Sequence, residues 1–354
     1  MTKKITAAIT VFVLVLSLCA CGITPEGTGD ETPGGRQFTD SAGRTVTVPE
    51  KIERIIPSGG LAQTFIWPMA ADKLVSLKTK LTPDQLRYLG DEFALLPESG
   101  DLYLTGGKFN VEAVAALSAD VYIDFGEFKD SIVEDLDELQ ELIGIPCVFI
   151  EGSFDNSENA YRMLGELLGE PEKAQELSDY IGSVLGKARD VLKRIDKKTL
   201  ALCDNADGLG CIARGTFRDE IWSFMGTNVV ELNEAQFYGF TTVNLEQLQL
   251  WDPEYLFFVS VDAYNDCVND PAWSGLRAVQ SGNCYTIPAL PQDFCYYPSV
   301  NRYLGIIWLA EIMYPDEFDW DIKSEIYKFY RLFYNCDLND ELYDYLMSPG
   351  HSLP

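Results

Sequence analysis

Hydrophobic residues recur every three or four positions along residues 171–195, and this spacing predicts one long helix. Pro171 suits its first turn, and Gly169 suits the end of a shorter helix predicted from Glu158 to Leu168. At about 1.5 Å per residue the long helix would measure about 38 Å, enough to cross a small domain. The apolar positions that would share one face are Ala174, Leu177, Ile181, Leu185, Ala188, Val191, Leu192 and Ile195.

The residues before this helix alternate between short apolar runs and amphipathic segments. Strands that alternate with helices indicate a mostly parallel sheet with both faces covered. The predicted elements are a hairpin over Phe38–Val48, strand Arg54–Ile56, helix Ala62–Ala71, strand Leu74–Leu77, helix Asn110–Leu117, strand Val121–Phe125, helix Ser131–Ile143 and strand Pro146–Ile150.

The same pattern begins again after the long helix. Residues 110–123, NVEAVAALSADVYI, align without a gap on residues 244–257, NLEQLQLWDPEYLF, and both read as a helix followed by a strand. A looser match pairs residues 69–75 with residues 225–230, in the same order along the chain. Two matches in one order indicate an internal repeat.

These patterns predict an α/β fold with two similar lobes, each built on a central, mostly parallel sheet. We expect an N-terminal lobe over residues 37–168, one long connecting helix over residues 169–196 and a C-terminal lobe over residues 197–354. Open α/β sheets bind ligands beyond the carboxyl ends of their strands, which predicts a ligand cleft between the lobes. The loops expected to line it follow Ile56, Leu77, Phe125, Asp204, Leu232 and Val259.

The first 21 residues have the features of a secretion signal. Lys3 and Lys4 precede an apolar run that is too short for a comfortable membrane span. Residues 18–21, LCAC, resemble a bacterial lipobox, which implies cleavage before Cys21 and a lipid on its thiol; Cys19 departs from the usual small residue. Residues 22–36 have the composition of a flexible tether. We therefore expect a protein anchored by lipid at the outer face of the cytoplasmic membrane.

Composition narrows the possible partners and chemistry. The 354 residues include 27 basic and 55 acidic side chains, a net charge of −28, which argues against nucleic acid as a partner. The seven cysteines after Cys21 include no CxxC pair and are expected to be mostly buried, and the only histidine, His351, lies near the end of the chain. A histidine-rich metal site is excluded. No cofactor is expected, and no nucleophile, phosphate-loop or zinc-protease motif indicates an enzyme.

Several short motifs, in order along the chain, resemble a known family. They are FTDSAGR at residues 38–44, the two Asn-x-Glu units, DPAW at residues 270–273, PSVNRYLG at residues 298–305 and FYRLFY at residues 329–334. Together they are similar to the helical-backbone substrate-binding proteins of ATP-driven (ABC) importers for ferric siderophores, haem and cobalamin. The resemblance covers about residues 38–346. It implies a monomeric receptor that delivers a metal chelate to a permease dimer.

Aromatic and basic side chains crowd the predicted cleft loops and form the candidate ligand site. Rings supply flat apolar surface for an organic shell, and cations suit carboxylates, hydroxamates or catecholates around a metal. Arg302 is the leading candidate, because the helix dipole disfavours an arginine in a first helical turn; the alternative is a simple pairing with a carboxylate. The candidate ligand-binding residues are Arg302, Tyr238, Tyr296, Tyr297, Arg214, Lys129, Phe237 and Asn301, whereas Phe125 and Phe294 are expected in the core.

The two Asn-x-Glu units carry glutamates at matching positions, Glu112 and Glu246. Asn110 and Asn244 are plausible N-caps, and a carboxylate in the first helical turn suits the helix dipole, so capping alone accounts for the pattern. The family resemblance adds that one glutamate per lobe docks on the permease. The ligand itself stays open among a ferric siderophore, haem, cobalamin and an oxyanion such as molybdate. An enzyme that processes metal chelates is the remaining alternative, and the absence of a cofactor motif argues against it.

Overall fold

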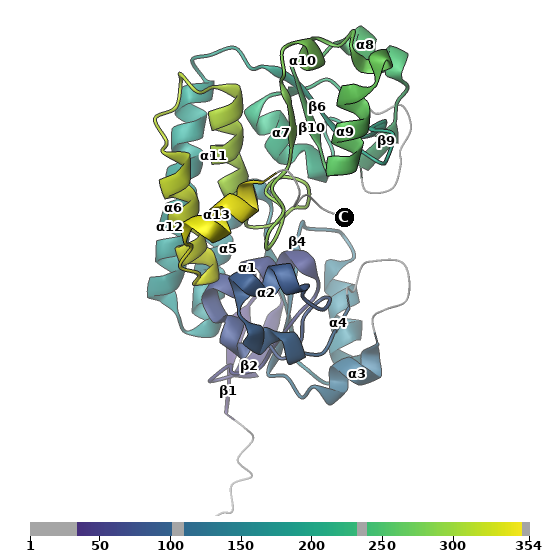
Figure 1. Cartoon of the computed structure of the whole chain (residues 1–354). Coiled ribbons are helices and arrows are strands. Elements are labelled where there is room, and N and C mark those ends of the chain that lie inside the picture. Colours follow the sequence, from purple (N-terminus) through teal and green to yellow (C-terminus); the bar gives the residue numbers. More distant parts are fainter. Residues whose placement is uncertain (1–33, 101–109, 232–238, 349–354) are drawn as a thin grey trace, which may run out of the picture. The chain divides into compact units, whose positions relative to one another are not determined.

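The computed structural model of the protein describes residues 34–100, 110–231 and 239–348 (Figure 1). The chain from Gly35 onward forms one compact unit. Cys21, Phe237, Tyr238 and His351 lie outside the described residues.

The first sheet is parallel and has helices on both faces. It contains β3 (Ile55–Pro57), β4 (Val121–Gly126) and β5 (Cys147–Glu151) in that order. Alternate side chains point to opposite faces, so Ile123 belongs to a cluster with α1 (Gly60–Ala70) and α5 (Ser157–Leu168), whereas Tyr122 belongs to a cluster with α3 (Val111–Ala116) and α4 (Ile132–Ile143). An antiparallel hairpin, β1 (Gly35–Thr39) and β2 (Thr45–Pro49), precedes the sheet as predicted.

One predicted strand is wrong. Leu74 and Leu77 make only isolated bridges, to Ile55 and Glu98 respectively. Because the two ends of this segment pair with different partners, no continuous ladder forms. The following residues fold into α2 (Pro83–Leu89), which begins with a capping box between Thr82 and Gln85.

The second sheet is also mostly parallel. Its order is β11-β10-β6-β7-β9 with β8 beside β6, and only the pairings of β7 are antiparallel. The strands are β6 (Thr199–Asp204), β7 (Gly210–Ile212), β8 (Thr227–Asn228), β9 (Phe240–Thr242), β10 (Tyr255–Phe258) and β11 (Cys284–Thr286). One face packs with α8 (Leu245–Trp251), α9 (Val261–Asn269) and α10 (Arg277–Gln280). Phe257 on the other face joins the main core with α7 (Glu220–Met225) and α11 (Arg302–Met313).

The long helix is α6 (Pro171–Leu192), which connects the two sheet-containing lobes. It ends three residues before the predicted Ile195, because the Arg194 N–H bonds the Val191 carbonyl and tightens the last turn. Gly169, at φ 73°, ends α5 as predicted. α6 packs against α5 and α11, and the chain closes with α12 (Ile322–Tyr334) and α13 (Asp340–Met347).

The repeated unit has the same structure in both lobes. The Asn110 side chain accepts a hydrogen bond from the Ala113 N–H at 3.0 Å, and Asn244 accepts one from Gln247 at 2.7 Å. Each capped helix is followed by a parallel strand, β4 in one lobe and β10 in the other. The predicted two-lobed α/β fold is therefore confirmed. Among the described residues all seven cysteines are free, and only Cys336 is not fully buried.

Candidate ligand-binding site

A cavity of about 210 Å³ lies at the carboxyl end of β4, the edge that the parallel-sheet rule indicates. The N-terminal lobe contributes Phe125, Glu127 and Lys129 to its lining. The C-terminal lobe contributes Phe217, from the 3-10 turn Phe217–Asp219. The two lobes thus meet at this cavity.

Beside the cavity, Arg218 lies within a cluster of three aromatic rings. Its guanidinium carbon is 4.4 Å from the ring centre of Tyr297 and 5.2 Å from those of Tyr296 and Phe240. One guanidinium nitrogen donates to the Tyr296 carbonyl at 3.3 Å. We call Arg218 with these three rings the Arg218 corner. It offers a cation and flat apolar surface together, which suits an anion with an organic shell.

Asp293 holds the loop that carries two of these rings. Its buried carboxylate accepts from the backbone N–H groups of Tyr296 and Tyr297 at 2.5 and 2.8 Å, and burial raises its pKa to about 6. The Tyr296 hydroxyl donates to Asp204 Oδ2 at 2.8 Å, at the end of β6. Tyr297 remains 39% exposed, so its ring is available to a ligand.

Arg302 occupies a different environment. It is 3% exposed, forms an ion pair with Glu220 at 3.2 Å, and donates to the Gly152 carbonyl at 2.8 Å and to Ser157 Oγ at 3.0 Å. The rings of Phe154 and Tyr303 lie within 5.5 Å of its guanidinium carbon. These contacts join α11 to the turn between β5 and α5. We call Arg302, with Glu220, Gly152, Phe154, Ser157 and Tyr303, the Arg302 junction.

Carboxyl groups near the junction have perturbed pKa values. Burial raises the pKa of Glu220 to about 7; Arg302 and the Phe154 N–H oppose this shift, while Glu127 and Asp155 add to it. Burial also raises the pKa of Glu127, against the effect of Arg302. Acid groups that titrate near neutrality often mark functional sites.

The other candidate residues are engaged within the protein. Lys129 pairs with Asp135 at 2.6 Å at the cavity, and Arg214 pairs with Glu231 at 3.1 Å. Asn301 is fully buried, where its amide donates to the Gln292 carbonyl at 2.7 Å. Phe125 and Phe294 are buried, as predicted. The ligand roles of these residues stay predictions.

Sequence reasoning did not single out Arg218. The candidate proposed from the sequence was Arg214, in the same loop. Phe217 and Arg218 follow it by three and four positions and combine a ring with a cation. That pair, directly before a helix, is the signal that points to this position. The structure shows why the two arginines differ, since only Arg218 lies against Tyr296 and Tyr297.

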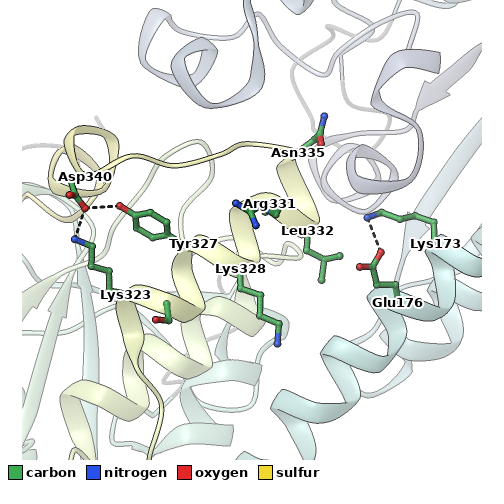
Figure 2. A pocket seen from close by; sticks show the side chains of 10 residues that line it. Lys173, Glu176, Lys323, Tyr327, Lys328, Arg331, Leu332, Asn335 and Asp340 are labelled. Atoms are coloured by element: carbon green, nitrogen blue, oxygen red, sulfur yellow. Dashed lines mark hydrogen bonds and ion pairs between the residues drawn. The ribbon is translucent and has the colours of Figure 1, made fainter.

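A larger cavity of about 750 Å³ lies between α6, α12 and α13 (Figure 2). Its cations already have partners: Lys173 pairs with Glu176 at 3.2 Å, Lys323 with Asp340 at 2.7 Å, and Arg331 with Asp337 at 2.8 Å. Lys328 lies over the ring of Tyr180. We place the candidate site at the smaller cavity, because that cavity lies at the carboxyl end of a parallel strand, whereas the larger one is lined by helix residues and their connections.

The sequence matches the family described as periplasmic binding protein over residues 74–290, more than half of the chain. The chain belongs to this family. It is 24% identical over 332 residues to the molybdate-binding protein MolA of Haemophilus influenzae, across 84% of this chain and 91% of that protein.

Solved structures share the fold. An ABC transporter solute-binding protein from Sulfurospirillum deleyianum aligns with a TM-score of 0.80 at 24% identity, over 88% of this chain and 98% of that one. MolA bound to molybdate aligns with a TM-score of 0.67 at 20% identity, over 86% and 99% of the two chains. The family model thus confirms the predicted membership among periplasmic binding proteins, and these structures share the fold.

The part of the chain that the structure describes has neither a membrane-spanning helix nor a metal-binding cluster. No helix in the described ranges has the length and apolar character needed to cross a bilayer. The same ranges contain no group of three or more histidine, cysteine or carboxylate side chains placed to hold a metal ion.

Proposed function

We propose that this periplasmic binding protein is the receptor of an ABC importer for an anionic metal complex, with a ferric-siderophore-like chelate as its ligand. The Arg218 corner carries this proposal, because it presents a cation and an exposed tyrosine ring beside a cavity between the lobes. Rings give flat contact area to an organic chelator, and a guanidinium binds its carboxylate, hydroxamate or catecholate oxygens. Haem and cobalamin remain alternatives within the same class of ligand.

A bare oxyanion such as molybdate is the second candidate. The observation in its favour is the similarity to MolA, which spans most of both chains. Arg218 would serve an oxyanion equally well, since a guanidinium offers paired N–H donors to two oxygens. The three rings distinguish the candidates, because an oxyanion gains little from apolar surface.

A binding panel tests the proposal. Residues 22–354, purified without the signal and Cys21, would be titrated with ferric catecholate and hydroxamate siderophores, haem, cobalamin and molybdate, with tryptophan fluorescence as the readout. We expect a ferric siderophore to bind most tightly, and mass spectrometry of copurified material provides an independent check. Preferential molybdate binding would establish the second candidate, and binding of none of these ligands would contradict both.

We also propose that Cys21 carries a lipid that holds the receptor at the outer face of the cytoplasmic membrane. The tetrapeptide LCAC supports this, since alanine precedes Cys21 whereas bulky Leu18 precedes Cys19. Cys21→Ala should release the protein into the medium, and Cys19→Ala should leave it in the membrane fraction. Equal membrane association of both variants would refute lipidation at Cys21.

Delivery to the permease is proposed to use Glu112 and Glu246. Both side chains are exposed in the first turn of a capped helix, α3 in one lobe and α8 in the other. Matching carboxylates on two similar lobes suit a permease with two related subunits. This supports one docking contact per lobe.

A further inference from the structure

The Arg302 junction gathers more negative than positive charge. Glu220 and Glu127 both interact electrostatically with Arg302, and Glu151 and Asp155 lie near them. Asp155 has its own partner, Arg189 of α6, at 2.6 Å. Glu151 accepts hydrogen bonds from Ser153 and Asn156. Glu220 and Glu127 thus both act on the Arg302 guanidinium.

Both of these carboxylates lie beside the proposed ligand site. Glu127 lines the cavity at the end of β4. Glu220 is the first residue of α7, two residues after Arg218, and lines a small crevice together with Arg218, Tyr297 and Arg302. An anion that enters at the Arg218 corner thus meets two carboxylates as well as two arginines.

We propose that Glu220 is a positioning residue that takes up a proton when the cleft captures an anionic ligand. The proposal rests on the proposed function and specifies how capture is regulated. In the free receptor the Glu220 carboxylate pairs with Arg302. When a solvent proton binds this carboxylate, its negative charge disappears, and the positive charge of Arg302 is no longer neutralised locally.

Arg302 itself need not move for this to occur. Its second nitrogen keeps the bonds to the Gly152 carbonyl and Ser157 Oγ, so the junction between α11 and the β5–α5 turn persists. Its Nε atom is buried and has no hydrogen-bond partner among the described residues. Protonation of Glu220 therefore changes the electrostatic potential in the cleft, while the contacts that hold the Arg302 junction together remain.

The charged groups around Glu220 act on its pKa in both directions, because Arg302 lowers it whereas Glu127 and Asp155 raise it. α11 contributes Arg302, the loop after β4 contributes Glu127, and the turn after β5 contributes Asp155. Arg218 and Asp219 lie directly before Glu220 in the chain. The Asp219 carboxylate accepts hydrogen bonds from the side chains of Ser223 and Asn228. The pKa of Glu220, raised to about 7 by burial, places the proton exchange near neutral pH.

The sign follows from linkage. An anion near Glu220 favours the protonated carboxyl group and so raises its pKa; by reciprocity the protonated receptor binds the anion more tightly. Affinity should therefore rise as pH falls through about 7. If ligand binding raises this pKa by one unit from its value of about 7, linkage gives about a fivefold gain in affinity from pH 8 to pH 6.

The experiment measures affinity against pH for three proteins. Wild type, Glu220→Gln and Glu341→Gln, each as residues 22–354, are titrated with a ferric catecholate siderophore and with molybdate at pH 6, 7 and 8. Glu341 is the matched control, because it also pairs with an arginine, Arg87 at 3.3 Å, but lines neither cavity. Protonation of the probe itself is common to all three proteins and cancels in the comparison.

We expect wild type and Glu341→Gln to bind about fivefold more tightly at pH 6 than at pH 8, and Glu220→Gln to show no such dependence. Equal affinity of wild type at pH 6 and pH 8, or an unchanged pH dependence in Glu220→Gln, would overturn the inference and leave the proposed function standing. Failure of wild type to bind either probe at any pH would overturn both.

A second measurement does not depend on the folding of a variant. Carbon-13 NMR of wild type with labelled glutamate carboxyl groups follows the midpoint of Glu220 with and without the bound probe. We expect the bound form to titrate at higher pH. An unshifted midpoint would assign Glu220 a structural role only.

Discussion

Two arginines close together in the C-terminal lobe have opposite environments. The Arg302 guanidinium is 3% exposed and is fixed by Glu220, Gly152 and Ser157, whereas Arg218 lies against rings of which Tyr297 is 39% exposed. Removal of one partner from a buried ion pair is costly, because it leaves the other charge buried without compensation. A cation beside the exposed Tyr297 ring lies where a ligand from solution can contact both groups. Residue type alone does not separate these two roles.

The largest effect is expected from removal of Arg302. Arg302→Ala leaves Glu220 without its cation and leaves the Gly152 carbonyl and Ser157 without a donor. Breaking one partner of a buried pair costs about 3–5 kcal/mol of unfolding free energy. Chemical denaturation measures this loss. Arg218→Ala, which removes the same side chain from the Arg218 corner, is the control and should cost about 1 kcal/mol or less. Equal losses would refute the contrast between the two arginines.

Ligand affinity should show the reverse order. Arg218→Gln keeps a polar side chain but removes the charge, and we expect binding of the ferric siderophore to weaken by about 1.5–3 kcal/mol, as for the loss of a charge-assisted hydrogen bond. Fluorescence titration measures the change. Arg277→Gln is the matched control, because Arg277 pairs with Asp252 on the surface and lines neither cavity. Unchanged affinity of Arg218→Gln with an intact fold would remove Arg218 from the site.

Two neighbouring glycines test how tightly the junction is packed. Gly152 donates its N–H to the Gly126 carbonyl at 2.9 Å, yet a Cβ atom on Gly152 would lie 2.0 Å from the Phe125 ring, whereas one on Gly126 would meet nothing within 4 Å. Gly152→Ala should therefore cost about 1–3 kcal/mol of stability through overpacking. Gly126→Ala should be close to neutral. Comparable melting temperatures for the two variants would show that Phe125 moves aside freely.

The exposed glutamates should have the smallest effect on stability. Glu112→Gln combined with Glu246→Gln removes two helix-dipole contacts, each worth about 1 kcal/mol or less. We expect ligand affinity to be kept and uptake by cells to collapse if both residues dock on the permease. Asn110 and Asn244 keep the caps in this variant, so it isolates the charge. Normal uptake would leave the glutamates with a capping role only.

Much of the fold followed from local pattern. The spacing of apolar residues predicted α6, and the repeated Asn-x-Glu unit predicted α3 with β4 and α8 with β10. These predictions held because each element is encoded by residues that are close together in the sequence. The segment Leu74–Leu77 failed as a strand, since a ladder needs a continuous partner that local sequence does not reveal. The capped helix α2 was not anticipated, although the capping box of Thr82 and Gln85 is visible in the sequence.

The candidate site depended more on tertiary structure. Tyr296 and Tyr297 were proposed from sequence, and the structure places both rings beside Arg218, a residue that was not proposed. Asn301 was proposed from its neighbourhood and is fully buried. A polar side chain in a loop has the same sequence signature whether it faces a cavity or a carbonyl group.

The sequence by itself determined the two α/β lobes, the long helix between them and the kinship with periplasmic binding proteins, because periodicity, caps and motifs are local or repeated features. Only the tertiary structure decided which arginine lies against the exposed Tyr297 ring and which one joins α11 to the turn after β5. The physical reason is that burial and ion pairing depend on residues far apart in the chain. Arg302 meets Gly152 across 150 positions, and no local pattern encodes that contact.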